Sequence, residues 1–213
     1  KLAVHPETSI LATADSLRRI SQWKLATAEL LSTAQLAASE KEPLAVADLK
    51  FSPDGTHLAV AGAESALRYL VAESGSLYRQ FSISERAKSL SFSPDGSRIY
   101  TTHLSGHCVE RDARTLEVQR TFSISEGVVR KISADISRDG RWLASGWEIV
   151  NGRGLRIVDL QSGKLIEELH DGLASLTFTP DQQSIFTGSD QKFILTPRSD
   201  QIAPRSLGKG DEM

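Results

Sequence analysis

The residues with the clearest potential for chemistry are two histidines and a cysteine that lie close together in the chain. His103, His107 and Cys108 have the residue types of metal ligands, and the two histidines have a suitable spacing. A structural zinc site needs about four such ligands, and no second cysteine or histidine pair lies nearby in the sequence. The three residues also fall where a repeat described below predicts a loop followed by a strand. We therefore predict no metal site.

Other catalytic patterns are weaker. No Gly-x-Ser-x-Gly motif marks one serine as a nucleophile. The glycine-rich segment Asn151-Gly-Arg-Gly154 lacks the Gly-Lys-Ser/Thr ending of a phosphate-binding loop, and no helix is expected after it. We predict that the chain is not an enzyme and needs no cofactor.

Composition limits the partners. The formal net charge is −2, aromatic residues make up 6% of the chain, and the basic pairs Arg18-Arg19 and Arg130-Lys131 are isolated. A nucleic-acid interface would need clustered cations with interleaved aromatic residues, so we expect no nucleic-acid partner. No apolar run approaches the roughly 18 residues that span a membrane, so we expect no membrane partner either.

The termini and the cysteine content bear on location. The chain begins at Lys1, already inside an apolar pattern, and lacks the residue order of a signal peptide. We interpret it as part of a longer or processed chain. The single cysteine suits a reducing cytoplasm, which is the location we expect, although many secreted bacterial proteins also lack disulfides.

The elements that position these residues are set by an internal repeat. Phe51-Ser-Pro-Asp-Gly55 returns as Phe92-Ser-Pro-Asp-Gly96, as Ile136-Ser-Arg-Asp-Gly140, as Phe178-Thr-Pro-Asp-Gln182 and, most weakly, as Val4-His-Pro-Glu-Thr8. Counted from the first residue of each phrase (4, 51, 92, 136, 178), the steps are 47, 41, 44 and 42 residues. Such regular spacing indicates a repeat architecture.

Each repeat predicts four short strands. Proline, aspartate and glycine favour a tight turn, and apolar residues alternate on both sides of it, as in Leu49, Phe51, Leu58 and Val60. A third and a fourth apolar run follow, separated by a Ser-Gly turn. Four strands in about 42 residues are typical of one β-propeller blade.

These motifs resemble the WD-repeat family, and the resemblance covers essentially the whole chain. It implies an all-β fold with five four-stranded antiparallel blades in a single domain over 1–213. The predicted blades cover 1–44, 45–86, 87–128, 129–172 and 173–207, followed by a polar tail over 208–213. Bacterial members look most similar. Seven blades are commonest in the family, so either five blades close the ring or two further blades lie outside this chain, and we favour the second.

The sequence departs from the family pattern at the blade ends. The Gly-His pair at the blade start is missing, and the terminal Trp-Asp is reduced to Gln22-Trp23, Arg111-Asp112 and Val158-Asp159. The buried Asp–His–Ser/Thr–Trp network of the family is therefore not expected in full in any blade.

Candidate binding residues lie where one repeat differs from the others. Between the second and third strands of the fourth blade, Gly146 to Leu155 spans nine steps, against five from Gly62 to Leu67. We predict a longer loop there that presents Trp147, Glu148 and Arg153 to a partner, because exposed tryptophan is enriched in binding hot spots. The alternative is that Trp147 covers its own blade.

Acidic residues in the links between blades add to this candidate site. Glu42 lies in the longer link after the first blade, and a repeated Ile-Ser-Glu phrase places Glu85 and Glu126 in later links. In a propeller these links open on the same face as the loops between second and third strands. All of them could also be solvated loop residues.

The function predicted from these features is a non-catalytic platform that binds another protein or peptide, within a larger bacterial protein or complex. The alternative is a propeller that senses a small ligand or glycan, or a fragment of a propeller hydrolase.

Overall fold

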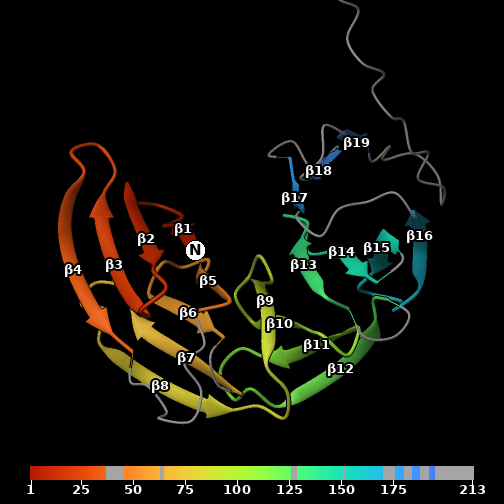
Figure 1. Ribbon diagram of the computed structural model, residues 1–213, viewed down its shortest axis with the longest axis horizontal. Coiled ribbons are helices and arrows are strands. Elements are labelled where there is room, and N and C mark those ends of the chain that lie inside the picture. Colours follow the sequence, from red (N-terminus) through yellow and green to blue (C-terminus); the bar gives the residue numbers. More distant parts are fainter. Residues whose placement is uncertain are drawn as a thin grey trace, which may run out of the picture. The chain divides into compact units, whose positions relative to one another are not determined.

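The fold is described from a computed structural model, which covers residues 1–36, 46–62, 65–125, 129–150, 152–169, 176–179, 184–187 and 192–194 (Figure 1). All regular secondary structure in these ranges is β-strand. The strands form five antiparallel sheets, each built from strands that follow one another in the chain. This confirms the predicted all-β class.

The first three sheets have four strands each. The first contains β1 (Leu2–Val4), β2 (Ile10–Ala14), β3 (Arg19–Lys24) and β4 (Glu29–Gln35). The second contains β5 (Asp48–Phe51), β6 (His57–Ala61), β7 (Ala66–Val71) and β8 (Leu77–Ser82). The third contains β9 (Ala87–Phe92), β10 (Arg98–His103), β11 (His107–Asp112) and β12 (Val118–Ser123).

The fourth sheet also has four strands, and the fifth has three within the described residues. The fourth contains β13 (Lys131–Ile136), β14 (Trp142–Ile149), β15 (Gly152–Asp159) and β16 (Leu165–Leu169). The fifth contains β17 (Leu176–Phe178), β18 (Ser184–Thr187) and β19 (Lys192–Ile194). The outermost strand predicted for the last blade, 203–207, lies outside the described residues.

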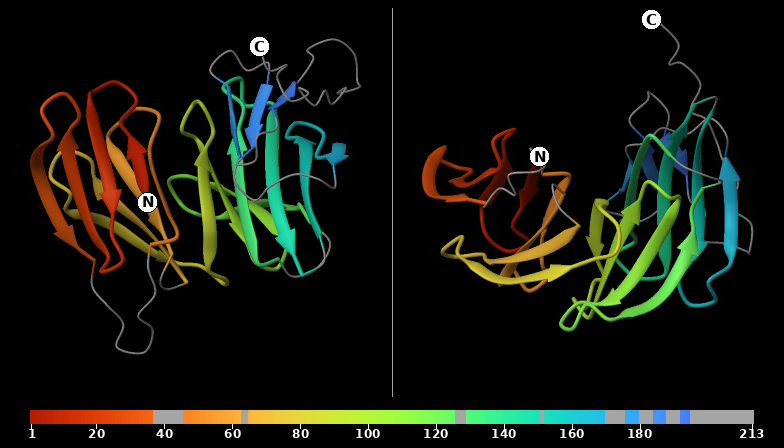
Figure 2. Two further views of the ribbon diagram at one scale, coloured as in Figure 1. Left: turned by 45° about the horizontal axis from the view of Figure 1, so that its top comes forward. Right: turned by 60° about the horizontal axis from the view of Figure 1, so that its bottom comes forward.

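The chain divides into two compact units. One comprises residues 1–103 and 109–120, and the other comprises residues 104–108 and 121–213. Figure 2 shows the strands of each sheet from two further directions.

The repeated phrase forms the same hydrogen-bonded turn each time it is well preserved. The Ser52 hydroxyl donates to Asp54 Oδ1 at 2.5 Å, and the Thr56 N–H donates to the same oxygen at 3.0 Å. Gly55 has φ +70°, a conformation that costs glycine little. Equivalent bonds join Ser93, Asp95 and Ser97, and likewise Ser137, Asp139 and Arg141. The prediction of tight turns is confirmed.

Within the first unit, apolar side chains pack between successive sheets. One cluster joins the first and second sheets, where Ala12, Ile20, Leu49 and Leu58 are at most 1% exposed. A second cluster joins the second and third sheets through residues such as Tyr69 and Leu90. In the other unit, a cluster that includes Leu155, Ile157 and Ile185 joins the fourth and fifth sheets. Alternation along the strands therefore provides both faces of a sheet with core residues.

An aspartate on an innermost strand also ties one sheet to the next. Asp48 Oδ2 on β5 accepts hydrogen bonds from the Leu90 N–H at 3.0 Å and the Ser89 hydroxyl at 3.2 Å, both on β9. In the other unit, Asp135 on β13 makes the same pair of bonds to the Phe178 N–H at 3.1 Å and the Thr177 hydroxyl at 2.9 Å on β17. We call these contacts the aspartate clamps.

Removing one clamp should weaken the stacking of sheets. Asp48→Ala leaves the Leu90 N–H without its acceptor and is expected to cost about 2 kcal/mol of unfolding free energy. Lys50→Ala, on the same face of β5, is the matched control and should stay within about 0.5 kcal/mol of the parent. Urea unfolding measures both. Equal stability of the two variants would show that the clamp contributes nothing.

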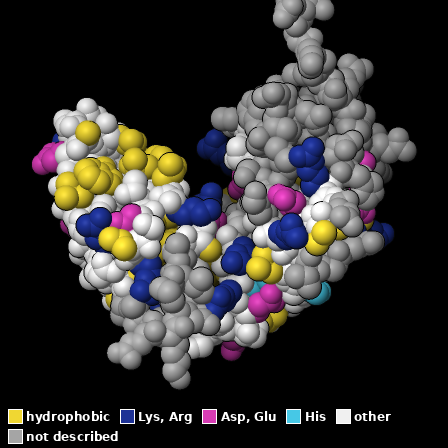
Figure 3. Space-filling model, in the orientation of Figure 1, with side chains coloured by type: hydrophobic (Ala, Val, Ile, Leu, Met, Phe, Trp, Pro, Cys, Tyr) yellow, Lys and Arg dark blue, Asp and Glu magenta, His cyan; other side chains and the backbone are white. Residues whose placement is uncertain are grey.

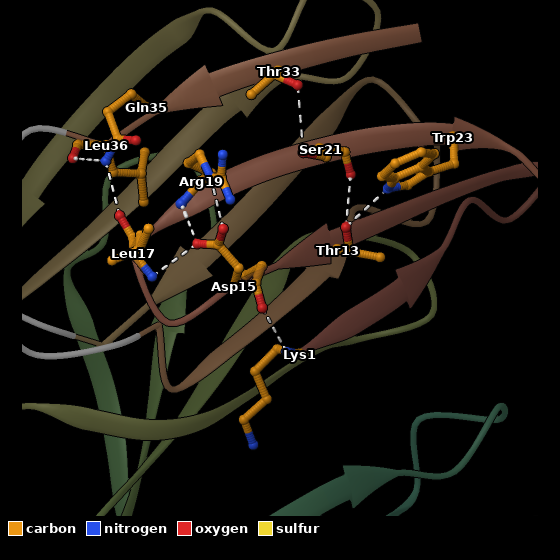
Figure 4. A network of polar contacts seen from close by, with 11 residues as sticks. Lys1, Thr13, Asp15, Leu17, Arg19, Ser21, Trp23, Thr33, Gln35 and Leu36 are labelled. Carbon is orange, nitrogen blue, oxygen red and sulfur yellow. Dashed lines mark hydrogen bonds and ion pairs between the residues drawn. The ribbon is translucent and has the colours of Figure 1, made fainter. Parts of the chain in front are cut away.

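The first sheet contains a tryptophan–threonine hydrogen bond like one part of the polar network in the family that the sequence resembles (Figure 4). Trp23 Nε1 donates to Thr13 Oγ1 at 2.9 Å, which links the second and third strands of this sheet. In the turn between them, Asp15 accepts the backbone N–H groups of Leu17 and Arg19 and pairs with the Arg19 guanidinium at 2.7 Å. These bonds, with the backbone N–H of Arg19 contributing most, hold the pKa of Asp15 below its ordinary value.

Candidate functional site

The extra residues of the fourth blade form a longer hairpin, so the prediction of a loop there is wrong. Strands β14 and β15 pair along their whole lengths, from Trp142 opposite Asp159 to Ile149 opposite Gly152. Trp147 lies within β14, opposite Gly154 on β15, and is 5% exposed. This burial favours the alternative in which Trp147 covers its own sheet.

The two charged neighbours of Trp147 are more accessible. Glu148 and Arg153 lie opposite each other on the paired strands, with Glu148 half-buried and Arg153 exposed. The Glu148 carbonyl accepts the Arg130 N–H at 2.7 Å. A role for these residues and Trp147 in partner binding stays a prediction.

Of the three acidic residues predicted in the links between blades, the structure describes one. Glu42 and Glu126 lie outside the described residues. Glu85, whose side chain is 43% exposed, lies in the first unit with its Oε2 4.0 Å from Nδ1 of the buried His103. Burial lowers the pKa of His103, and the charge of Glu85 opposes this effect.

The two histidines of the candidate metal motif differ in their surroundings. His103 Nδ1 lies 3.1 Å from the Arg86 carbonyl oxygen, and Nε2 lies 2.9 Å from Thr101 Oγ1. His107 is exposed at the start of β11 and Cys108 is buried behind it. Within the described residues, no three histidine, cysteine or carboxylate side chains are placed to hold a metal ion together.

A pocket that the sequence did not predict lies in the first unit, between the second and third sheets. Its volume is about 320 Å³, within the range of ligand pockets. It lies on the side of the Pro-Asp-Gly turns, whereas the predicted binding loops were expected on the opposite side. The lining residues that matter most are His57, Tyr69, Tyr78, Arg79, Phe92 and Arg114. We call this the aromatic–arginine pocket.

Aromatic rings form the wall of this pocket. The rings of His57 and Tyr78 are 4.6 Å apart between centroids, and Tyr69 stacks on Phe92 at 6.3 Å. Tyr69 is buried, which raises the pKa of its hydroxyl, and that hydroxyl donates to the Ala113 carbonyl at 2.9 Å. Tyr69 therefore fixes the wall, while Tyr78, 53% exposed, is available for contact.

Two arginines, Arg79 and Arg114, line the pocket. The Arg79 guanidinium lies over the Tyr78 ring, 5.6 Å from its centroid, and over the Phe81 ring at 6.0 Å. Its Nη1 donates to the Arg114 carbonyl at 3.5 Å. Both arginine side chains are exposed. The site thus combines an aromatic surface with two cations supplied by different sheets.

A second exposed surface is apolar and belongs to the first sheet. On β1, Ala3 is buried against the second sheet, whereas Leu2 and Val4 on the other face are 66% and 56% exposed. Trp23 and Leu30 are paired across β3 and β4, and Leu30 is also exposed. Apolar side chains gather over this part of the unit in the space-filling view (Figure 3, upper left). Exposed apolar surfaces of this kind commonly take part in protein contacts.

Comparisons with known proteins support the resemblance to WD-repeat β-propellers. The family model described as anaphase-promoting complex subunit 4 WD40 domain matches residues 2–87. A solved structure described as Kuenenia stuttgartiensis hydrazine synthase superimposes with a TM-score of 0.73 and 19% identity, covering 86% of this chain and 53% of that one. The WD40 family model thus matches the part of the chain that forms the first two sheets, and the solved structure supports the same fold for most of the chain.

Curated relatives carry the same name in two organisms. The U3 small nucleolar RNA-associated protein 18 homologs of Homo sapiens and Mus musculus are both 24% identical, over 85% and 84% of this chain. The chain spans 33% of the length of each of these relatives. Because they are human and mouse proteins, they give no support to the predicted bacterial origin. In the part of the chain described here, no helix is long and apolar enough to cross a membrane.

Proposed function

We propose that this chain is a non-catalytic protein–protein interaction module of a larger protein or complex, and that a peptide segment of the partner binds in the aromatic–arginine pocket. WD40 domains commonly act as interaction scaffolds, which agrees with the family that this chain resembles. The main observation behind the proposal is that an exposed tyrosine and two exposed arginines line the same pocket. Tyrosine and arginine are enriched among residues that dominate binding energy.

The packing of the first unit makes this pocket a rigid platform. Tyr69 is held by its hydrogen bond to Ala113, and Asp54 is held by Ser52 and Thr56. These bonds fix the wall and floor before a partner arrives, so binding loses little conformational entropy there. Support for a larger assembly comes from the exposed apolar face of the first sheet and from the greater length of the curated relatives.

The residues predicted from the sequence define a second candidate surface. Glu148 and Arg153 are accessible on the long hairpin, and Glu85 is partly accessible in the other unit. A small ligand is the second candidate function, favoured by the volume of the aromatic–arginine pocket. The cytoplasmic location and the number of blades in the full ring stay predictions.

Peptide display on the purified chain tests the proposal. Selected peptides should bind the parent chain, bind the Tyr78→Ala variant at least tenfold more weakly, and bind the matched Arg153→Ala variant as tightly as the parent. Peptides that depend on Arg153 and not on Tyr78 would move the binding site to the predicted hairpin. Failure to select any peptide that binds a single site would contradict the function itself.

A further inference from the structure

We infer that the aromatic–arginine pocket recognises an acidic side chain of a peptide, with an apolar or aromatic residue next to it. This inference rests on the proposed function and names the chemistry of the partner. Three features support it: two arginines without a carboxylate partner among the described residues, the aromatic rings next to them, and nearby aspartates that already accept hydrogen bonds in their own turns.

The two arginines are not neutralised by carboxylates of the described chain. Other exposed arginines are paired, such as Arg19 with Asp15 at 2.7 Å and Arg141 with Asp159 at 3.4 Å. Within the described ranges, no carboxylate lies at ion-pair distance from Arg79 or Arg114. Arg79 donates one long bond to a carbonyl, which leaves most of its N–H donors for an incoming anion.

The carboxylates near the two arginines already accept hydrogen bonds from residues of their own turns. Asp54 accepts from the Ser52 hydroxyl and the Thr56 N–H, and the Ser52 bond is the main cause of a pKa below the ordinary value. Asp112 accepts the N–H groups of Arg114 and Thr115, both at 2.9 Å, which lowers its pKa in the same way. These anions stabilise the turns that carry the pocket and remain in place when a ligand arrives.

The rings explain why an apolar neighbour should accompany the acid. A guanidinium within about 6 Å of a ring centroid is attracted to the ring face, and its N–H groups can still bind an anion. Arg79 is held in this way over Tyr78 and Phe81. The exposed ring of Tyr78 and the half-buried Phe92 then offer an apolar surface beside the anion site.

A single anionic side chain suits this site better than a nucleic-acid backbone. Each additional phosphate contact needs a further cation, whereas the turns around the pocket carry Asp54, Asp95 and Asp112. These fixed negative charges would repel the neighbouring phosphates of a strand. A peptide can place one carboxylate between the arginines and keep the rest of its length neutral.

Nuclear magnetic resonance on the isotope-labelled chain tests this directly through the Nε–Hε signals of Arg79 and Arg114. The probes are a blocked peptide of alternating glutamate and phenylalanine, its glutamine counterpart and a single-stranded oligouridylate. The glutamate peptide should shift both arginine signals and bind at least tenfold more tightly than the glutamine peptide. Added salt should weaken it, because exposed charges are screened.

Charge-removing variants complete the test. Arg79→Gln with Arg114→Gln should reduce affinity for the glutamate peptide at least tenfold, whereas Arg130→Gln, at an exposed arginine outside this pocket, should leave it unchanged. Equal binding of the glutamate and glutamine peptides would overturn this inference, as would an arginine response to the oligouridylate alone. If display-selected peptides depend on Tyr78 but show no acidic preference, the proposed function stands and only this inference fails.

Discussion

Trp147→Ala is expected to lower the free energy of unfolding by about 3–5 kcal/mol, the cost of truncating a large buried aromatic residue. Trp147 is 5% exposed within β14 and is paired with Gly154 on β15. For a chain of this size the melting temperature should fall by roughly 6–20 °C. Calorimetry or thermal unfolding followed by circular dichroism measures the change.

Two variants separate packing from other effects. Arg153→Ala removes an exposed side chain from the same hairpin and should change stability by less than about 0.5 kcal/mol. Trp147→Phe keeps most of the ring and removes an indole N–H that has no hydrogen-bond partner among the described residues, so it should cost much less than alanine. A Trp147→Ala variant with unchanged stability and weakened partner binding would instead support the binding role predicted from the sequence.

The repeat was predictable because its turns depend on local backbone preferences. Gly55, Gly96 and Gly140 have φ of 70°, 71° and 72°, which the aspartate–glycine pair at the end of each repeated phrase indicates directly. Leu116 was not predictable in the same way. It has φ +59° in the turn where Gly75 and Gly163 occur in other blades, and its side chain is buried. There the packing of a leucine in the core outweighs the local preference of the backbone.

The length of the fourth hairpin was misjudged because extra residues between two strands can form either a loop or longer strands. The loop interpretation came from the nine steps between Gly146 and Leu155, against five at the same place in the second blade. In the structure, Gly154 is paired with Trp147 within the hairpin, so this glycine belongs to a strand and not to a loop. Only the partner strand reveals which role a glycine has.

The aromatic–arginine pocket could not be predicted because its parts come from different repeats. Arg79 and Arg114 are 35 residues apart in the sequence and meet because the second and third sheets stack. One signal was available: two of the three tyrosines of the chain, Tyr69 and Tyr78, occur in the same blade as His57. Alternation along the strands indicates which side chains are exposed, but it does not indicate which of them meet across two blades.

Gly55 and Gly96 occupy equivalent turns, but we expect alanine substitutions at these two positions to lower the free energy of unfolding by very different amounts. Both have nearly the same φ, so replacement by alanine carries the same backbone strain of about 1–2 kcal/mol. At Gly96 an added Cβ would meet only Pro53, at 3.6 Å, whereas at Gly55 it would lie 2.5 Å from His5 Nε2 and closer still to Cε1. Gly96→Ala should therefore cost only the strain.

His5 cannot move aside without loss. Its Nδ1 accepts the N–H groups of Glu7 and Thr8, both at 3.1 Å, which places the ring proton on Nε2, 3.0 Å from the Gly55 carbonyl oxygen. Its ring also packs 5.0 Å from Phe51. Gly55→Ala must displace this ring, so we expect a total cost of about 3–4 kcal/mol, in which a lost hydrogen bond is one part.

A double-mutant cycle in urea isolates the collision. In a His5→Ala background, Gly55→Ala should cost no more than Gly96→Ala does in the parent, because only the strain of the positive φ remains. The coupling between His5 and Gly55 should then be about 2 kcal/mol, well above the few tenths found for residues that do not touch. Equal costs for Gly55→Ala and Gly96→Ala in the parent chain would show that His5 does not contribute to the packing of the first sheet against the second.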